Sequence, residues 1–404
     1  MGDILFLAHR VPFPPDRGDK IRAYHILKHL AAHRRVHLVT FAESSHDMKA
    51  KGGLDRLTAN RSIFWRSKTR ARAVLEALVS GQAASVTAFR HPMVPGAVRA
   101  LLARHAIDTI YVFSSQMAQY LPPPSPRRRV VMDFVDVDSA KFADYAKGAR
   151  WPMSWLYRRE ASALLAHDRA VATRADLSLF VSEAEAALFR ARTGAERVHA
   201  VENGIDADRF APDADFRRIE SQGQLIVFTG QMDYPPNVEA VTWFARSVLP
   251  HIRLRHPDAR FAIVGRNPTA EVEAFARGEG VIVTGEVPDV RGWLAAAAVV
   301  VAPLKLARGV QNKVLEAMAM ARPVVVSGAA AEGIDHDGTI CVADDVAGIA
   351  DAVVALLDDP DQAEELGRSA REQVKRRYGW EARLAVLDEL LGLTPRRQRR
   401  SAAA

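Results

Sequence analysis

Short, continuous apolar runs alternate with longer stretches whose apolar residues recur at helical spacing along nearly the whole chain. In the first half these runs are 3–7, 36–41, 109–113, 129–135 and 176–181, and in the second half they are 225–230, 260–265, 281–285, 299–303 and 323–327. An uninterrupted apolar strand is buried on both faces, as in a parallel sheet that is covered by helices. Two such series predict an α/β protein with two doubly wound, Rossmann-like domains.

A polar, aspartate-rich stretch separates the two series. It spans 201–224 and contains glycine and proline, which is typical of a linker. We therefore predict a first domain over 1–200 and a second domain over 225–377. The rest of the chain is expected to form a helix over 378–393 that packs back toward the first domain, followed by a basic, disordered tail over 394–404.

The composition excludes several classes of protein. The 404 residues are 49% hydrophobic and 25% charged, which is typical of a globular protein and excludes a largely disordered chain. Cys341 is the only cysteine, so no internal disulfide framework is possible. No apolar run reaches the roughly 18 residues of a membrane span, and the first ten residues resemble a strand more than a signal peptide. We predict a cytoplasmic protein.

The net charge of +7 is concentrated in three basic stretches, 60–81, 125–129 and 394–400. In the first stretch Phe64 and Trp65 lie among arginines and lysines, a combination typical of a segment that binds an anionic membrane surface. The alternative is a solvated basic face. No nucleic-acid-binding motif accompanies the charge, so we expect no nucleic acid partner. The membrane interpretation predicts a peripheral position at the inner face of the cell membrane.

The loop after the first strand has features of an anion-binding site. Gly18 permits close approach of a ligand to the backbone, and a helix is expected to start near Asp19. Arg22, on the first turn of that helix, would add a positive charge. An ordinary turn between a strand and a helix is the alternative interpretation.

Three aspartates follow one another at the end of the strand 129–135. Asp133, Asp136 and Asp138 lie so close in sequence that their charges repel unless a neighbour offsets them. Asp136 is the candidate for a base or a group that orients an acceptor hydroxyl. Asp138 and Ser139 could instead cap the next helix, Asp133 could be a buried structural acid, and a metal site is a further alternative.

The segment "GVQNKVLEAMAMARPVVVS", 309–327, carries the strongest signal, because an apolar helix there leads into a β-branched strand. A phosphate at the start of this helix would face three backbone amides, those of Gly309, Val310 and Gln311. Lys313 would supply a mobile cation, and Arg308, just before the glycine, a second one. This helix start is therefore predicted to bind a diphosphate.

Glu316 lies one turn after Lys313, on roughly the same side of the helix. A carboxylate there could accept two hydrogen bonds from a ribose diol. The alternative is a surface ion pair between the two side chains, which would contribute only about 0.2–0.5 kcal/mol. The apolar residues of the helix disfavour it, because they bury the opposite face and turn Lys313 and Glu316 toward the carboxyl ends of the strands.

These stretches resemble the GT-B glycosyltransferases of family 4, a large retaining group that includes many bacterial polysaccharide enzymes. The resemblance covers nearly the whole chain except the tail, and its motifs are "VENGID" (201–206), "FTGQMDYPPNVEA" (228–240), "IVGRNP" (263–268) and "GVQNKVLEAMAMARPVVVS". More narrowly, "FVDVDSAKFADYA" (134–146) together with "GVQNKVLEAMAM" resembles the sugar transferases associated with exopolysaccharide and PEP-CTERM/exosortase systems. The fold implied is GT-B, in which two doubly wound domains face each other across a cleft.

The resemblance implies that the first domain binds the acceptor and the second binds the nucleotide sugar. By position, Glu316 matches the second glutamate of the family's donor-site motif, which holds the nucleotide ribose. Gly230 matches the glycine after the first strand of the donor domain. Gly18 and Arg22 match the flexible loop of the acceptor domain near the donor phosphate.

The chain departs from the family pattern in three places. Arg308 stands where the first glutamate of the motif contacts the transferred sugar, so the resemblance does not carry over sugar recognition. The usual cation pair after the first donor-domain strand is absent from "GQMDYPPN". Aspartates also occupy the region where many relatives place a histidine, and Asp136 is our candidate for its position.

We therefore predict a hexosyltransferase (EC 2.4) that moves a sugar, with retention, from a nucleotide diphosphate-sugar to a lipid-linked or saccharide acceptor in exopolysaccharide biosynthesis. Asp136, Lys313 and Glu316 are the predicted catalytic residues. The nucleotide sugar is a substrate, and neither cofactor nor metal is required if cations and a helix end stabilise the leaving diphosphate. Two alternatives are a nucleotide-sugar 2-epimerase of similar fold and an inactive nucleotide-sugar-binding paralogue, which Arg308 would explain. The donor base, the sugar, the acceptor and the oligomeric state stay open.

Overall fold

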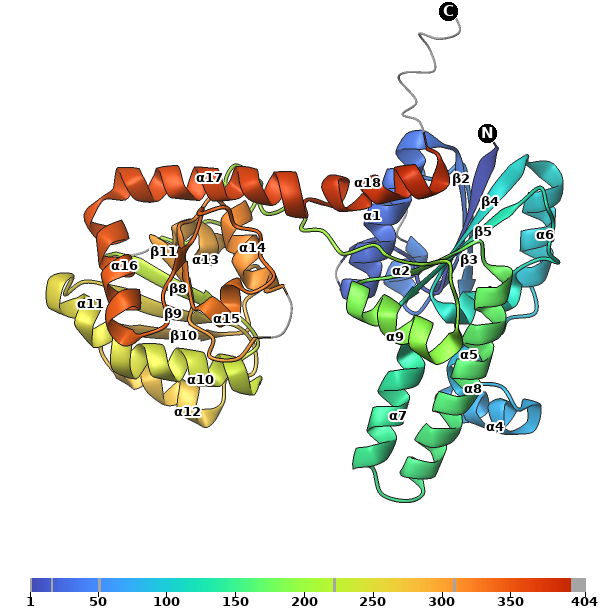
Figure 1. Cartoon of the computed structure of the whole chain (residues 1–404), viewed down its shortest axis with the longest axis horizontal. Helices are drawn as coiled ribbons and strands as arrows, with labels where there is room; N and C mark the ends of the chain where they lie inside the picture. The colour runs from blue at the N-terminus through green and yellow to red at the C-terminus, as the bar shows by residue number, and fades with distance from the viewer. Residues whose placement is uncertain (1, 16, 50–51, 221–222, 308–309, 394–404) are drawn as a thin grey trace, which may run out of the picture. The chain divides into compact units, whose positions relative to one another are not determined.

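The computed structural model describes the chain apart from residues 1, 16, 50–51, 221–222, 308–309 and 394–404 (Figure 1). The chain divides into two units, one formed by 1–203 with 384–404 and the other by 204–383. The predicted domain limits stay a prediction in their detail. The tail and Arg308 with Gly309 lie outside the described residues.

The first unit is built on a seven-stranded sheet in the order β3-β2-β1-β4-β5-β6-β7, and all neighbouring strands are parallel. The strands are β1 (Asp3–Ala8), β2 (Val36–Ala42), β3 (Asn60–Trp65), β4 (Ile107–Phe113), β5 (Arg129–Val135), β6 (Leu177–Phe180) and β7 (Val198–Ala200). In the central strand β1, Leu5 and Leu7 belong to the core that also contains residues of α6, whereas Phe6 stacks on Tyr111 of β4. Burial on both faces explains the uninterrupted apolar run.

Helices connect these strands (Figure 1). They are α1 (Gly18–His33), α2 (Ser45–Lys49), α3 (Gly52–Asp55), α4 (Arg70–Ser80), α5 (Ala84–Thr87), α6 (Val94–Arg104), the 3₁₀ turn η1 (Ser115–Tyr120), α7 (Asp138–Gly148), α8 (Met153–Arg174) and α9 (Glu183–Thr193). Helical crossovers between parallel strands bring the carboxyl ends of those strands to one edge of the sheet. That edge carries the segments after β1, β4 and β5.

The second unit repeats the plan with a six-stranded parallel sheet in the order β10-β9-β8-β11-β12-β13. Its strands are β8 (Leu225–Thr229), β9 (Arg260–Val264), β10 (Val281–Gly285), β11 (Val299–Ala302), β12 (Val324–Val326) and β13 (Cys341–Val342). Its helices are α10 (Pro235–Trp243), the π-helical turn η2 (Phe244–Val248), α11 (Leu249–Arg255), α12 (Ala270–Ala274), the 3₁₀ turn η3 (Phe275–Arg277), α13 (Arg291–Ala296), α14 (Asn312–Ala319), α15 (Gly328–Ala331), α16 (Val346–Asp358) and α17 (Pro360–Tyr378). The predicted α/β class, with two doubly wound parallel sheets, is confirmed.

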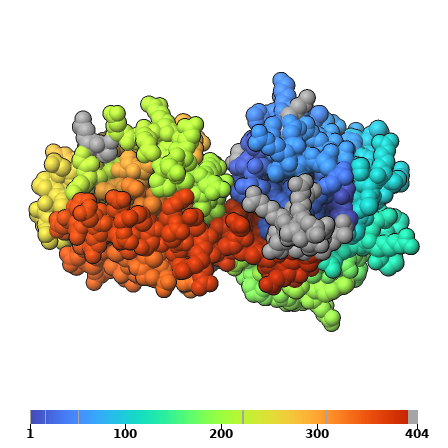
Figure 2. All heavy atoms as spheres, turned by 90° about the horizontal axis from the view of Figure 1, so that it is seen from above, coloured from blue at the N-terminus to red at the C-terminus, as the bar shows by residue number. Residues whose placement is uncertain are grey.

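The chain passes from the second unit back to the first between residues 383 and 384, after the end of α17. The outer face of α17 lies on the surface of the second unit (Figure 2), and Ile205 N donates to Tyr378 O at 2.7 Å near its end. Gly204 must lack a side chain there, since a Cβ would lie 2.6 Å from the backbone of Trp380. Helix α18 (Trp380–Leu391) follows, and its Asp388 contacts His29 of α1 at 2.9 Å within the first unit.

None of the helices in the described ranges is both long enough and apolar enough to cross a membrane.

Candidate functional site

The predicted phosphate-binding helix is α14, which begins at Asn312 rather than near residue 309. Gln311 precedes it in an extended conformation, and Val310 is exposed. The helix forms because its apolar residues, Val314, Leu315, Ala317, Met318 and Ala319, are buried in the core of the second unit. Burial of that face leaves Lys313 and Glu316 on the other side, as the sequence pattern predicts.

Lys313 reaches back to the end of β8. Its Nζ donates a hydrogen bond to Asn237 Oδ1 at 2.6 Å and lies 4.2 Å from the centre of the Phe228 ring. Burial lowers the pKa of Lys313 to about 8, although the charge of Glu316 opposes the shift. The ammonium is therefore held in place by one amide and one aromatic ring, and no carboxylate of the described residues is bound to it.

Gly230, which follows β8 directly, makes this arrangement possible. A Cβ at Gly230 would lie 2.8 Å from Asn237 Nδ2 and 3.2 Å from Lys313 Nζ. The end of the neighbouring strand β9 also packs closely against Gly230, because a Cβ on Gly265 would lie 1.6 Å from Gly230 O. Gly230 thus leaves room for the lysine beside the starts of α10 and α14, and both helix starts are partially positive.

Glu316 is half-buried and has no hydrogen-bond or ion-pair partner among the residues that the structure describes. Burial raises the pKa of Glu316 to about 7, against the opposing charges of Arg209 and Lys313. Since the Lys313 ammonium donates to Asn237, the alternative of a surface ion pair between Lys313 and Glu316 is wrong. A carboxylate without a partner in a partly buried position is an acceptor available to a ligand.

The side chain of Arg22 binds groups in the core of the first unit. It is only 1% exposed, and its guanidinium binds the Asp133 carboxylate at 3.1 and 3.3 Å. It also donates to Val201 O at 2.7 Å and to Asn203 Oδ1 at 2.9 Å. These core groups occupy the guanidinium and favour a structural role for Arg22, so its expected contact with a donor phosphate stays a prediction that this geometry does not support. Asp133 is the buried structural acid that the sequence left open.

Gly18 is the first residue of α1, one residue before the predicted start. Apart from its chain neighbours and the backbone of its own helix, no atom of the described residues lies within 4 Å of where its Cβ would be, so these contacts do not require a glycine at this position. Open space at a helix start is compatible with the predicted approach of a ligand, which stays a prediction.

Asp136 lies after β5 and is partly exposed. Lys141 Nζ donates to its carboxylate at 2.6 Å and lies 3.3 Å from Asp138. Helix α7 begins at Asp138 without a side-chain cap, so the capping role of Asp138 and Ser139 is wrong. Glu185 accepts the Val137 amide instead, at 2.6 Å. Asp136 remains accessible and has a cation beside it.

Sequence reasoning missed a polar network directly after β1. His9 is buried, stacks 5.9 Å from the Phe113 ring centre and lies 3.2 Å from Asp19, which also binds Arg10 at 2.6 Å. Burial lowers the pKa of His9, although Asp19 opposes the shift. Its Nδ1 has no partner among the described residues. The signal was available, because "AHR" follows the first strand at the edge where ligands bind.

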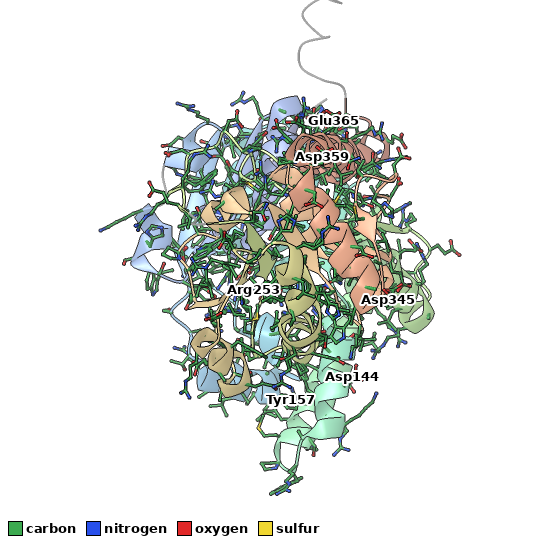
Figure 3. The ribbon with its side chains drawn as sticks, turned by 90° about the vertical axis from the view of Figure 1, so that its left-hand side faces the viewer. Asp144, Tyr157, Arg253, Asp345, Asp359 and Glu365 are labelled. Atoms are coloured by element: carbon green, nitrogen blue, oxygen red, sulfur yellow. The ribbon has the colours of Figure 1, made fainter. Side chains whose placement is uncertain are left out.

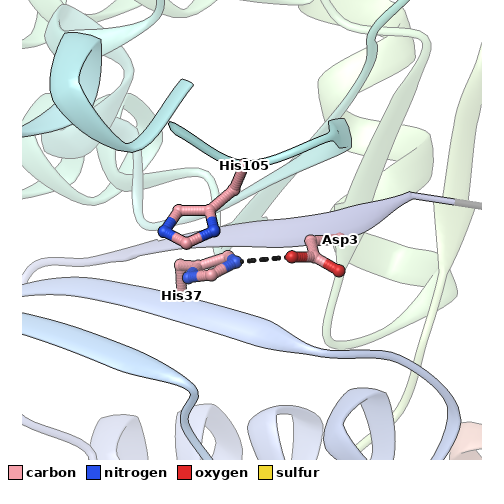
Figure 4. Close-up of side chains that lie close together, drawn as sticks. All are labelled: Asp3, His37 and His105. Atoms are coloured by element: carbon pink, nitrogen blue, oxygen red, sulfur yellow. Dashed lines mark hydrogen bonds and ion pairs between the residues drawn. The ribbon is translucent and has the colours of Figure 1, made fainter. Parts of the chain in front are cut away.

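A group with possible metal ligands lies at the opposite edge of the same sheet. Asp3, at the start of β1, accepts a hydrogen bond from His37 at 2.8 Å, and His105 stacks on His37 with ring centres 4.2 Å apart (Figure 4). The second nitrogen of His37 lies 3.0 Å from Asn60. One ligand atom from each of Asp3, His37 and His105 lies within 4.8 Å of the others. Because both nitrogens of His37 are hydrogen-bonded, to Asp3 and to Asn60, this geometry favours a structural role.

Residues 223–359, which include α14 and Gly230, match the family model "Glycosyl transferases group 1". The chain is 29% identical over 339 residues to the GDP-mannose-dependent alpha-(1-6)-phosphatidylinositol monomannoside mannosyltransferase of Mycolicibacterium smegmatis, covering 77% of this chain and 82% of that protein. The Mycobacterium tuberculosis (strain ATCC 25618 / H37Rv) protein of the same name is 28% identical over 345 residues, covering 77% of this chain and 85% of that protein.

Solved structures with the same fold cover nearly the whole chain. Anabaena Alr3699/HepE in complex with UDP has a TM-score of 0.58 at 15% identity and covers 96% of this chain and 99% of that one. Sucrose-phosphate synthase from Thermosynechococcus elongatus has a TM-score of 0.59 at 17% identity, with full coverage of both chains (100% each). At such identities the likeness shows the fold alone. Together, the matched family model, the curated relatives and the two parallel-sheet domains show that the chain is a glycosyltransferase with the GT-B fold.

Proposed function

We propose that the protein transfers a hexose, with retention, from a nucleoside diphosphate sugar to a lipid-linked or saccharide acceptor. The observation that carries the proposal is the pair at the start of α14. Among the residues that the structure describes, the half-buried Lys313 ammonium has no carboxylate bound to it, and the half-buried Glu316 carboxylate has no partner. A diphosphate and a ribose diol are the ligands that complement these two groups.

The chemistry follows from where charge develops. When the bond between the sugar and the diphosphate breaks, the leaving diphosphate gains negative charge. The Lys313 ammonium and the amides at the start of α14 are fixed in advance and need little rearrangement to stabilise that charge. Arg308 and Gly309 precede this helix and are proposed to act with it. This assignment needs no metal, and we expect transfer to persist in the presence of a chelator.

Asp136 is proposed to orient or deprotonate the acceptor hydroxyl. It is accessible and lies after β5, at the sheet edge where ligands bind in parallel α/β folds. Asp133 is a poorer candidate, because Arg22 and Tyr111 occupy its carboxylate. Burial raises the pKa of Asp138, with Lys141 opposing, so Asp138 is the second candidate for the base.

A lipid-linked acceptor is supported by the two mycobacterial relatives, whose names specify phosphatidylinositol monomannoside as the acceptor and GDP-mannose as the donor. A place in exopolysaccharide biosynthesis rests on the narrower resemblance of residues 134–146 to the sugar transferases of PEP-CTERM/exosortase systems.

Product analysis separates this proposal from an epimerase. A transferase labels a lipid or saccharide with the sugar, whereas an epimerase returns a changed nucleotide sugar.

Lys313→Ala tests the donor site directly. UDP, GDP, ADP and TDP are titrated by calorimetry alongside their nucleosides. The variant is expected to lose about 10- to 100-fold in diphosphate affinity and less than about 2-fold in nucleoside affinity, because it loses a charged hydrogen-bond donor. Lys375→Ala is the matched control, since Lys375 is an exposed lysine that pairs with Glu372 three residues earlier.

An equal loss for nucleoside and diphosphate would remove Lys313 from the phosphate site. Tight diphosphate binding without transfer to any lipid or saccharide fraction would favour the inactive paralogue.

A further inference from the structure

The hairpin formed by α7 and α8 projects from the sheet of the first unit (Figure 1) and exposes large apolar side chains near its turn. Trp151 is 80% exposed and Trp155 is 51% exposed, with Tyr145 and Met153 also exposed nearby in the sequence. Exposed tryptophan is uncommon in a globular protein, because burying its ring is strongly favourable. Two of them on one hairpin require an explanation.

Contacts between aromatic rings join the two helices of the hairpin. Phe142 of α7 lies 6.2 Å from Tyr157 of α8, and Tyr145 lies 5.9 Å from Tyr157, measured between ring centres. Figure 3 labels Asp144 on α7 and Tyr157 on α8, on the part of the hairpin that projects. The exposed tryptophans therefore lie on a hairpin whose two helices are in contact with each other.

Helix α4 is joined to the same hairpin. Arg159 of α8 donates to Ala77 O of α4 and, at 3.2 Å, to Gln82 O just after it. On α4, Leu75, Leu78 and Val79 are exposed. Of the 16 large hydrophobic side chains that the described residues expose, seven lie on α4 and the hairpin: Leu75, Leu78, Val79, Tyr145, Trp151, Met153 and Trp155. We call these seven residues the hairpin patch.

The charge around the turn has one sign. Residues 145–159 contain Lys147, Arg150, Arg158 and Arg159 and no acidic residue. Lys147 pairs with Asp144 at 2.7 Å, but both side chains are largely exposed, so the pair is weak. Aromatic rings beside a net positive charge match the boundary of a bilayer, where rings enter the headgroup region and cations reach lipid phosphates.

We propose that the hairpin patch binds the surface of a bilayer that contains anionic phospholipid. The patch gathers its tryptophans on a projecting hairpin, which suits shallow insertion into a flat surface. The tips of tryptophan and tyrosine can hydrogen bond to headgroups while their rings contact acyl chains. The proposal rests on the proposed function in one respect, since a lipid-linked acceptor would be found at such a surface.

This surface differs from the one that the sequence suggested. Phe64 lies in β3 and packs 6.3 Å from Phe41 and 5.1 Å from His91, so it is not free to enter a membrane. Trp65 is exposed at the end of the same strand. Within the basic stretch 60–81, it is α4 that contributes to the patch.

The test uses the full chain and vesicles of phosphatidylcholine with or without phosphatidylglycerol. The wild type is expected to sediment with the anionic vesicles and to be released as salt rises. Trp151→Ser/Trp155→Ser should lower the partition coefficient at least about 10-fold, because both aromatic anchors are lost. Lys147→Gln/Arg150→Gln should lower it roughly 5-fold for each charge removed, on anionic vesicles only.

Trp65→Ser/Leu254→Ser is the matched control, because both residues are exposed, at 44% and 83%, outside the patch. It should sediment like the wild type. The proposal is overturned if the tryptophan variant sediments unchanged, if the control variant is the one that loses binding, or if the wild type ignores anionic vesicles. A patch variant that changes the oligomeric state without affecting sedimentation would make the patch a protein interface instead.

Nucleoside diphosphate affinity is measured on the same variants and should stay within about 2-fold of the wild type. A failure of vesicle binding with intact nucleotide binding would refute only the membrane surface. A failure of nucleotide binding in the wild type would refute the proposed function and leave the vesicle result to stand by itself.

Discussion

The two units place charged side chains at the same edge of the same kind of sheet, yet they use them differently. In the first unit these charges bind one another: Arg22 lies on Asp133, and Lys20 lies 2.8 Å from Asp47. In the second unit Lys313 donates to an amide, and Glu316 has no partner among the described residues. Oppositely charged groups that stand one turn apart have not been paired.

The difference separates structure from binding. A buried charge is stabilised only when a partner compensates for the lost water, and the first unit supplies such partners internally. In the second unit burial instead shifts the pKa of Lys313 to about 8 and that of Glu316 to about 7, which leaves both groups close to a change of charge. Shifted pKa values of this kind are typical of residues in a ligand-binding or catalytic site.

Asp136→Asn tests whether the first unit contributes a catalytic carboxylate, although most of its charged groups at this edge pair with one another. Transfer of labelled sugar to a membrane lipid extract, from whichever nucleotide sugar binds, is expected to fall about 10²- to 10⁴-fold, because a general base is lost. Nucleoside diphosphate affinity, measured by calorimetry, should not change.

Asp144→Asn is the matched control for that change. Asp144 lies on the adjoining helix α7 and binds Lys147 at 2.7 Å, much as Asp136 binds Lys141 at 2.6 Å. Its loss should leave transfer intact. Full activity of Asp136→Asn together with an inactive Asp138→Asn would transfer the role to Asp138.

Arg22→Met tests the opposite assignment, that this arginine is structural. The change leaves the Asp133 carboxylate buried without its cation, which typically costs about 3–5 kcal/mol of unfolding free energy. Thermal unfolding should show an early transition for the first unit, while a transition stabilised by nucleoside diphosphate stays in place. Arg35→Met, at an exposed arginine 3.9 Å from Asp3, should change the unfolding free energy by less than about 0.5 kcal/mol.

If Arg22→Met were as stable as the wild type and bound the diphosphate less tightly, the sequence-based assignment of Arg22 to the donor phosphate would regain support over the structural one.

The strands could be predicted because burial on both faces imposes a local pattern. The apolar runs 225–230 and 299–303 became β8 (Leu225–Thr229) and β11 (Val299–Ala302) with an error of one residue. The start of α14 was predicted three residues too early, because the sequence gives no sign that Gln311 is extended. Local periodicity thus fixes the type of an element better than its end.

The partners of charged residues could not be predicted in the same way. Arg22 and Asp133 are 111 residues apart, and Lys313 and Asn237 are 76 residues apart. Both Arg22 and Lys313 lie near the start of a helix that follows a strand, so their local sequences predict the same role. Only the folded structure shows that Arg22 binds a carboxylate whereas Lys313 binds an amide. The charge of Arg22 is therefore neutralised within the protein, and that of Lys313 is available to a ligand.

The smallest expected effect concerns pH, and it tests the second unit's pair within the wild type. A carboxylate with a pKa of about 7 accepts hydrogen bonds from a ribose diol best when it is charged, so affinity should fall as pH drops below about 7. An ammonium with a pKa of about 8 attracts a diphosphate only when protonated, so affinity should also fall as pH rises above about 8. We call these two decreases the acid limb and the alkaline limb of the pH profile. In each limb the affinity should fall a few-fold, measured by calorimetry between pH 5.5 and 9.

The bare nucleoside decides what each limb means, because it has no phosphate that could itself titrate. It should keep the acid limb, which comes from Glu316, and lack the alkaline limb, which comes from Lys313. Glu316→Gln should abolish the acid limb and weaken binding about 5-fold near pH 7.5, since an amide oxygen is a weaker acceptor than a carboxylate. An acid limb that survives in this variant with the nucleoside would mean that another group contacts the ribose, and the contrast between the two units would then rest on Lys313 alone.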